Sequence, residues 1–587
     1  MSNFRLAVVW LVSVGTTLAW GESPGAAPRA RVDLTSELPV IVDAIPSDSG
    51  VRNGEPDLSS AVIDVERIDL GPLLDAVARK DERPRVQLTL DDCVQLALEA
   101  NPDVVVASYE PLKADGDILS ARGEFDPQLT GDVSYLRATQ AASPEIQAFS
   151  GITSIETYRT SGQTGVAGRL RWGTQYSVSL NMDKEETTYN NFIEEWSGGV
   201  TLTVSQPLLR GRGKAVNLTR IRQAENGRGL TESQLRLTVL TAVSEVLKAY
   251  WDLVGATETV RVRGESLANA QRLLDINEKR RDIGTAAAIE VIQAKAGVAT
   301  RISDLIAAQS LVKDAEDFLK QLLDMREEGA LAATRIVPVN RPSLEEMRYD
   351  EAESVALALE HRPEIVSACL EIENAELERK RAANDLLPQF DVTASVYQGG
   401  RGHYPRDVFR GIDDVFDSVG SIAAGVDDRD NFSYSVGFQG SVPLGNRTAR
   451  GVHQRAKMAV DQTKRRLEKA RLDAVARVGF ALRALETSRI LVLSNRQTRG
   501  LQETNVAAEE KRLELGLTTS YRVLEVQEDL TFAQTQEVQA LVNYEKAIVD
   551  VRLAEGMLLD HLGIAFEAPE PVPAVSFVRS IRTPAAE

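Results

Sequence analysis

The 587-residue chain has few histidines and cysteines, two residue types that enzymes and metal proteins often use for chemistry. Its four histidines are scattered, with neither the spacing of metal ligands nor a serine or cysteine partner pattern. No cofactor or metal site is therefore expected, and an enzyme is not predicted. The only two cysteines, Cys93 and Cys369, lie in apolar-patterned helical stretches. They are not at equivalent positions of the internal repeat described below, so two unrelated buried thiols are predicted in preference to a structural disulfide.

Long apolar runs are also scarce. Residues 1–21 contain Arg5, a short apolar stretch and then small residues before a cleavage point after Ala19 or Gly21, which is typical of a secretory signal peptide. Beyond them, no run approaches the roughly 18 apolar residues that a membrane-spanning helix needs. The formal charge of −19 argues against a nucleic-acid partner and favours an exported protein.

Proline is absent from two long tracts, between Pro207 and Pro338 and between Pro443 and Pro569. Both tracts are rich in Ala, Leu, Glu, Arg and Gln, with apolar residues three and four positions apart, which predicts very long helices. Each tract has one glycine break preceded by basic residues, as helix C-termini prefer. We therefore expect two helical hairpins, with helices over residues 214–282, 288–323, 448–514 and 520–562.

The chain also repeats itself. Segment 94–104 returns as 355–365 at an offset of 261 (355 − 94), whereas Pro207 and Pro443 are related by an offset of 236 (443 − 207). Such ordered self-similarity indicates a duplicated structural unit, with 25 extra residues (261 − 236) in the first copy. The expected division is a signal peptide over 1–21, a flexible N-terminal extension over 22–85, a first repeat over 86–323, a linker over 324–347, a second repeat over 348–562 and a C-terminal tail over 563–587.

The stretches before each long helix alternate apolar and small polar side chains, which predicts strands with one apolar face. Residues 129–135 and 200–205 do so in the first repeat, and residues 390–396 and 432–439 do so in the second, giving about four principal strands. Alternation over 176–182 suggests an added hairpin that accounts for the extra residues. Lipid admits only helices and closed barrels, and four strands are too few to close a barrel, so a membrane location would require several chains.

In this order, the features resemble the TolC-like outer-membrane efflux protein family, over roughly residues 86–562. The resemblance rests on the duplicated order of helix, strands, long helix, glycine turn and helix, on the junction SQPLLRGRG at 205–213, and on LGLTTSYRVLEVQ at 515–527. It implies a mainly α fold with β, in which a homotrimer pools four strands per chain into a 12-stranded outer-membrane β-barrel. An α-helical barrel would continue the channel through the periplasm of a Gram-negative-type bacterium.

The resemblance also implies a function and partners. The chain would be the passive exit duct of a tripartite efflux or type I secretion system, held in outer-membrane lipid and driven by an inner-membrane pump through a periplasmic adaptor (a membrane fusion protein). Drugs, metal ions and secreted polypeptides all pass through members of this family, so the cargo stays open. The alternatives are a secreted coiled-coil structural or adhesion protein, which would not explain the strands, and an efflux adaptor, which would show lipoyl-like β motifs.

Two sets of residues at the expected hairpin tips are candidate sites. Glu290, Arg522 and Glu525 are candidates for a periplasmic gate, because threefold symmetry would crowd their charges around a pore; a solvated helical i, i+3 pattern is the alternative. By resemblance, the two tips are candidates for contact with the adaptor; simple helix C-caps are the alternative. The tip residues are Ile283, Gly284 and Thr285 in the first hairpin and Leu515, Gly516 and Leu517 in the second.

Two further features have modest expectations. The run from Gly211 to Lys214 suggests a phosphate-binding loop, but the motif's first glycine and its Ser or Thr are missing, so a turn between a strand and a helix is predicted. Trp172 and Trp196 flank the strand region and are candidates for an interfacial aromatic belt.

Overall fold

The computed structural model describes residues 83–188, 191–284, 286–325, 334–344, 349–405 and 432–566, together with 70–72, 74 and 347. The chain divides into two units, residues 1–65 and 66–587, and all described residues lie in the second. The expected signal peptide, most of the expected N-terminal extension and most of the expected tail lie outside the described residues.

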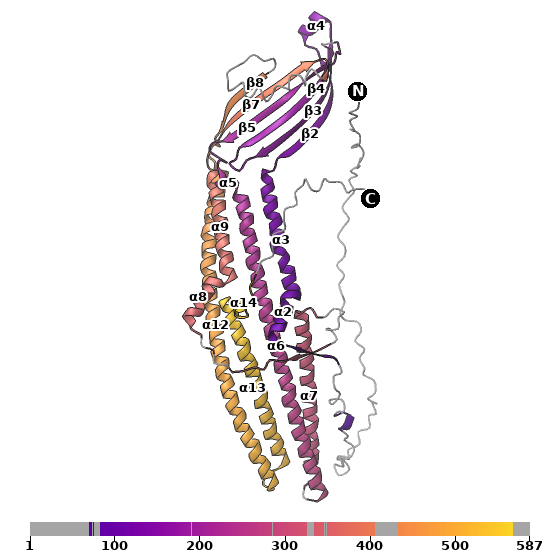
Figure 1. Ribbon diagram of the computed structural model, residues 1–587, viewed down its shortest axis with the longest axis vertical. Helices are drawn as coiled ribbons and strands as arrows, with labels where there is room; N and C mark the ends of the chain where they lie inside the picture. The colour runs from indigo at the N-terminus through magenta and orange to yellow at the C-terminus, as the bar shows by residue number, and fades with distance from the viewer. Residues whose placement is uncertain are drawn as a thin grey trace, which may run out of the picture. The chain divides into compact units, whose positions relative to one another are not determined.

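Two series of helices follow one another in the same order along the chain (Figure 1). In each series two helices precede strands, and a long helix and a returning helix follow them. The first series is α2 (Leu90–Ala100), α3 (Pro102–Arg122), α5 (Lys214–Asn217), α6 (Thr219–Asp282) and α7 (Ala288–Leu322). The second is α8 (Glu351–His361), α9 (Pro363–Asn384), α12 (Arg447–Glu514), α13 (Ser520–Glu555) and α14 (Leu558–His561).

Equivalent residues of the two repeats begin equivalent helices. Pro102 and Pro363 occupy the first turns of α3 and α9, where a helix has no use for a backbone N–H. The side chain of Asn101 caps α3 by accepting hydrogen bonds from the N–H groups of the next two helical residues after Pro102, and its amide donates to the carbonyl of Leu322 at 2.8 Å. This asparagine therefore links the start of α3 to the end of α7.

The predicted helices are confirmed with two corrections. The first long helix does not start at Lys214 as one element, because Leu218 (φ −92°, ψ 5°) separates α5 from α6. The single helix expected over 520–562 is wrong, because Gly556 adopts a φ of +77° and ends α13. A Cβ atom there would lie 3.3 Å from the backbone of His361 and Arg362, so glycine lets the end of α13 lie against the corner between α8 and α9.

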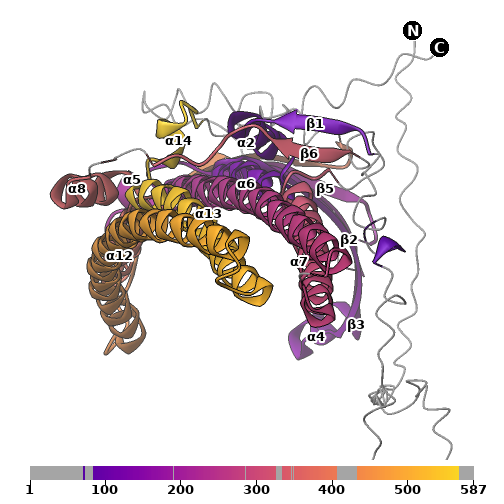
Figure 2. The ribbon, with the colours of Figure 1, turned by 90° about the horizontal axis from the view of Figure 1, so that it is seen from below.

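The two long helices connect two levels of helix packing. Next to the large sheet, neighbours follow the order α3, α6, α9, α12, and farther from it the order is α7, α6, α13, α12. Figure 2 shows the second set lying along a curve. Because α6 and α12 take part in both levels, each of them connects its helical hairpin to the strands of the sheet.

In the part of the chain that the structure describes, six antiparallel strands form the large sheet, in the order β2-β3-β4-β5-β7-β8. They are β2 (Gln128–Ala141), β3 (Ser154–Arg169), β4 (Gln175–Thr187), β5 (Glu195–Pro207), β7 (Gln389–Gly402) and β8 (Phe432–Ser441). The added hairpin predicted over 176–182 is confirmed as β3 and β4. The four strands per chain that the resemblance implied are wrong for this sheet, because the hairpin is inserted between β2 and β5. The number of strands in an assembled barrel stays a prediction.

A small parallel sheet lies beside the helices. It pairs β1 (Arg85–Leu88) with β6 (Arg335–Pro338), and β6 falls in the stretch expected to be a linker, where no strand was predicted. The hydroxyl of the fully buried Tyr250 on α6 accepts hydrogen bonds from the backbone N–H groups of Val339 and Asn340, each at 3.1 Å. The chain between the repeats is therefore fixed to the first long helix.

A buried carboxylate joins α7 to the small sheet. Glu316 is 1% exposed and lies 2.8 Å from Lys320 Nζ, and it accepts two hydrogen bonds of 3.2 Å from the guanidinium of Arg83. Lys320 in turn donates to the carbonyl of Thr334, next to β6. Because charges so far from water need partners, this cluster fixes the ends of both strands against α7.

The two cysteines are free and differ in environment. Cys93 on α2 is buried, and burial raises the pKa of its thiol to about 12. Cys369 on α9 is exposed, so the expectation of two buried thiols is wrong for this residue. Among the described residues, none of the helices combines the length and apolar character needed to cross a membrane.

The buried cluster gives a stability prediction. Replacing Glu316 by Gln removes the buried negative charge that Lys320 and Arg83 both contact, which should lower the free energy of unfolding by about 3–5 kcal/mol. The matched control is Glu371→Gln, because Glu371 forms an exposed pair with Arg466 at 3.8 Å. This substitution should lower the free energy of unfolding by less than about 1 kcal/mol. Urea unfolding of the purified protein measures both, and equal midpoints for the two variants would contradict the role of Glu316.

Candidate functional site

The large sheet has one apolar and one polar face. Strand register places one apolar row across all six strands: Leu129, Val166, Val178, Leu202, Val396 and Tyr434. The next residue along β2 begins a row of small and polar residues, Thr130, Gly165, Ser179, Thr201, Tyr397 and Ser433. The strand patterns predicted separately from the sequence thus coincide on the same two faces.

The apolar face is not covered by any other described part of the chain. Leu129 and Val133 on β2 are 78% and 82% exposed, and Val436 and Phe438 on β8 are 64% and 69% exposed. The helices lie beyond one end of the sheet and leave its faces open (Figure 1). An exposed apolar face of this extent marks a surface that contacts another apolar phase or partner.

The two tryptophans singled out in the sequence lie at opposite ends of the sheet. Trp172 is in the turn between β3 and β4 at the helical end, and Trp196 is near the start of β5 at the other end. The Trp172 ring lies under the Lys214 ammonium, 4.5 Å from its centroid. Aromatic side chains at both ends of an apolar face are typical of strands that meet lipid headgroups, so the belt stays a prediction that this placement allows.

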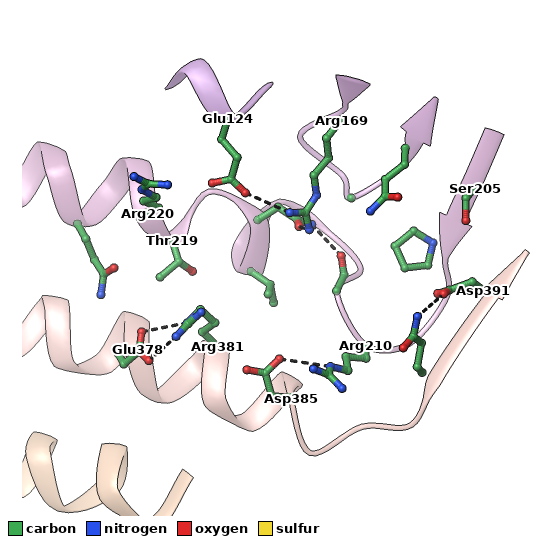
Figure 3. Close-up of a pocket in the computed structure, with 18 residues that line it drawn as sticks. Glu124, Arg169, Ser205, Arg210, Thr219, Arg220, Glu378, Arg381, Asp385 and Asp391 are labelled. Carbon is green, nitrogen blue, oxygen red and sulfur yellow. Dashed lines mark hydrogen bonds and ion pairs between the residues drawn. The ribbon is translucent and has the colours of Figure 1, made fainter. Parts of the chain in front are cut away.

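A polar cavity of about 710 Å³ lies where the sheet meets the helices (Figure 3). Strand residues that line it, including Arg169, Ser205 and Asp391, belong to the polar face. Residues Arg220 of α6 and Arg381 of α9 line its helical side. The cavity therefore continues the polar face of the sheet onto the helices.

Most charges around this cavity are paired. Arg169 donates to Glu124 at 3.1 Å and to the side chain of Asn217, and Arg381 pairs with Glu378 at 2.9 Å on its own helix. Arg210 lies 3.6 Å from Asp385. These pairs, drawn in Figure 3, leave a hydrated surface of mixed charge. Arg169 was not among the predicted residues, although its place on the polar side of a strand is visible in the sequence alternation.

The run from Gly211 to Lys214 is a turn between a strand and a helix, as predicted. Gly211 and Gly213 have φ angles of +81° and +93°, and α5 starts at Lys214. The N–H of Gly213 donates to the carbonyl of Trp172 at 2.8 Å. The loop therefore supports the neighbouring hairpin of the sheet.

The predicted hairpin tips are turns with exposed apolar side chains. Gly284 and Gly516 take φ angles of +77° and +72°, and a backbone bond of 2.8 Å from Leu517 to Arg512 closes the second turn. Ile283 and Leu515 are each 74% exposed. Thr285 lies outside the described residues. Both turns are helix C-caps, which leaves the contact role untested.

The three gate candidates do not form one cluster of free charges. Arg522 and Glu525 form an exposed i, i+3 ion pair at 2.6 Å on α13, and this hydrogen bond raises the pKa of the arginine. Glu290 lies in the first turn of α7, with Oε2 3.3 Å from the hydroxyl of Ser520. In one chain, therefore, Arg522 and Glu525 satisfy each other, and Glu290 faces the other hairpin.

A small polar contact that the sequence did not reveal joins the hairpins near their tips. The hydroxyl of Ser520 on α13 is fully buried and donates to Oδ1 of Asn277 on α6 at 2.9 Å. Beside it, a groove of about 440 Å³ lies between α6 and the second hairpin, lined by Ile276, Leu515 and Gly516. Ser520 follows a helix cap and resembles an ordinary first-turn residue in the sequence, so only the fold reveals its partner.

Comparison with known proteins matches both repeats. A model of the family described as outer membrane efflux protein matches residues 93–324 and 355–556. Outer membrane efflux protein BepC of Brucella suis biovar 1 (strain 1330) is 23% identical over 468 residues, which cover 78% of this chain and 91% of BepC. The pyoverdine export outer membrane protein OpmQ of Pseudomonas aeruginosa is 24% identical over 307 residues, which cover 50% of this chain and 58% of OpmQ.

Solved structures agree in fold. The CmeC outer membrane channel of Campylobacter jejuni matches with a TM-score of 0.57 at 18% identity, covering 80% of this chain and 86% of the CmeC chain. Similarity at this level concerns the arrangement of helices and strands and not the identity of individual site residues.

Proposed function

The chain belongs to the outer membrane efflux protein family, and from that premise we propose that it is the exit duct of a tripartite efflux or type I secretion system. Members of this family are outer-membrane channels and not enzymes. The proposal places the strands in the outer membrane and the helices in the periplasm of a Gram-negative-type bacterium. The observation that carries it is the two-faced sheet, whose apolar face is exposed and whose polar face continues into a charged cavity at the helices.

Assembly into a homotrimer is supported by the unpaired edges of the sheet. β2 and β8 are its end strands, and in an antiparallel sheet of six the two end strands run in opposite directions. β8 of one copy can therefore continue the ladder antiparallel to β2 of the next. The helical edges also carry exposed apolar side chains, among them Phe480 on α12 and Leu311 and Phe318 on α7. A closed ring of three copies would cover both kinds of edge.

Passage of cargo follows from this arrangement. The polar face would line an aqueous pore, because side chains alternate between lipid and lumen along each strand. The 64 residues of α6 and the 68 residues of α12 each extend about 100 Å, at roughly 1.5 Å per residue, and would prolong the pore toward the inner membrane. A conduit of this kind has no energy source of its own, so a pump in the inner membrane would drive export through a periplasmic adaptor.

The hairpin tips are proposed to contact that adaptor. The exposed side chains of Ile283, Leu515 and Leu517 support the proposal, as does the groove beside Gly516. The second proposed role, a periplasmic gate formed by Glu290, Arg522 and Glu525, is supported by their position close to the tips, Glu290 in the first turn of α7 and the other two near the start of α13.

A secreted coiled-coil structural or adhesion protein was the alternative. It would account for the long hairpins, but it assigns no role to the exposed apolar face of the sheet. The channel assigns a role to both parts of the molecule.

Substitutions on the two faces of β2 test the membrane assignment. Val133→Lys puts a charge on the apolar face and should cost about 2–4 kcal/mol per copy near the middle of the membrane, so heat-modifiable, SDS-resistant trimers should decline in the outer-membrane fraction. Ser134→Lys, one residue along on the polar face, is the matched control and should assemble normally. Equal trimer yields for both variants would remove the assignment.

The adaptor proposal predicts a loss of binding without a loss of assembly. Leu515→Asp combined with Leu517→Asp places charges on side chains that are 74% and 66% exposed, so folding should be unaffected. Co-purification with the adaptor and pump should fall at least about tenfold, the effect of roughly 1.4 kcal/mol. Lys469→Asp, in an exposed pair far along α12, serves as the control; undiminished co-purification of the tip variant would refute the contact.

The gate proposal predicts a change in conductance. Replacing Glu290 and Glu525 by Gln removes two negative charges per copy and leaves Arg522 unpaired, so cation preference in planar bilayers should fall. Channels with the same conductance and ion preference as the parent would assign Arg522 and Glu525 to an ordinary surface pair.

A further inference from the structure

Resting on the proposed function, we infer that the β3–β4 hairpin enlarges the pore. Three copies close a barrel of eighteen strands instead of twelve, and the channel admits cargo that is too broad for a twelve-stranded barrel. Three features of the described residues carry this inference: the pairing of the hairpin, the agreement of its faces with those of the sheet, and the way its turn is supported.

The hairpin is an integral part of the sheet along its whole length. β3 pairs with all 14 residues of β2, from Gln128 to Ala141, and β4 pairs with β3 at 13 positions and with β5 at 11. β2 and β5 make no direct pairs among the described residues, because the hairpin separates them. A barrel that excluded the hairpin would have to break the β2–β3 and β4–β5 ladders. It would then have to form a new ladder between β2 and β5.

The faces of the hairpin agree with those of its neighbours. Val178 and Leu180 on β4 lie opposite Leu202 and Val200 on β5, and Val166 on β3 lies opposite Leu129 on β2. On the other face, Ser179 lies opposite Thr201. A hairpin that stood outside the membrane would have no need to keep its apolar and polar residues in phase with the sheet.

The helices explain why the hairpin needs separate support. β2, β5, β7 and β8 each connect directly to one of the helices α3, α5–α6, α9 and α12, in the same order as the helices pack, whereas β3 and β4 join only each other at this end. Their turn, residues 170–174, is held instead by side chains and backbone of adjacent elements. The carbonyl of Trp172 accepts a hydrogen bond of 2.8 Å from the N–H of Gly213, and the Trp172 ring contacts Lys214. Arg169, at the end of β3, donates hydrogen bonds to Glu124 and Asn217.

Close backbone approach completes this support. Gly173 has a φ of +98°, and a Cβ atom there would lie 2.3 Å from the carbonyl oxygen of Gly211. The turn thus occupies the space between the end of α3 and the start of α5, where two strands rest on no helix of their own. The cavity of Figure 3 borders this position.

The size of the effect follows from barrel geometry. The diameter of a barrel grows roughly in proportion to strand number, so eighteen strands give a diameter about 1.5 times that of twelve and a cross-section about twice as large. Barrels of 16–18 strands are wide enough to leave an aqueous channel. The hairpin is therefore a determinant of cargo size in the membrane part of the channel.

Two measurements on full-length trimers test the inference. Cryo-electron microscopy in lipid nanodiscs should count eighteen strands. In planar bilayers, polyethylene glycols added on the extracellular side should enter the wild-type barrel up to a hydrodynamic radius about 1.5 times the limit for a variant lacking residues 154–187. That deletion removes 34 residues (187 − 154 + 1). Because Leu129 of β2 and Leu202 of β5 lie in one apolar row and the two strands are antiparallel, β2 can pair with β5 with both faces preserved.

Deletion of α4 (Pro144–Ser150), which lies beyond the far end of β2, is the matched control and should keep the wild-type polymer limit. A barrel of twelve strands with the hairpin outside it would overturn the inference and leave the proposed channel intact. Equal polymer limits for the wild type and the 154–187 deletion, or an equal shift on deleting α4, would also overturn it. A wild-type chain that forms no membrane trimer would instead refute the proposed function.

Discussion

The requirement that every backbone group of a sheet be hydrogen-bonded constrains this molecule more than any single side chain does. Among the described residues of one chain, β2 and β8 have strand partners on one side only, and such open edges favour pairing with another strand. In lipid the requirement is stricter, because no water replaces a missing partner. On the proposed assembly, the edges of three chains satisfy one another, and the curved order of the helices in Figure 2 follows the same ring.

The helices hold the strands in the positions that this closure needs. α6 and α12 take part in both helix levels, and polar contacts such as that of Ser520 with Asn277 join the two hairpins near their tips. At the small sheet, Tyr250 and the Glu316 cluster fix the chain between the repeats to α6 and α7. α6 and α12 are the helices that run from these contacts to the strands.

Much of this organisation could be predicted from the sequence. Proline-free tracts and glycine breaks located the long helices, and period-two alternation located the strands, including the hairpin at 176–182, because these signals are local. The order of the strands in the sheet is not a local property, and the four strands per chain that the resemblance implied did not include the added hairpin. The partners of Glu290, Ser520 and Arg169 were also out of reach, since each pair joins residues more than 40 positions apart.

The central claim is that one face of the sheet meets lipid and the other meets water. Nitroxide labels placed singly at positions 392 to 396 of β7 in lipid-reconstituted trimers test it most directly, by their accessibility to oxygen and to a water-soluble nickel chelate. The account predicts that positions 392, 394 and 396 favour oxygen and that 393 and 395 favour the chelate. High chelate accessibility at all five positions would contradict it.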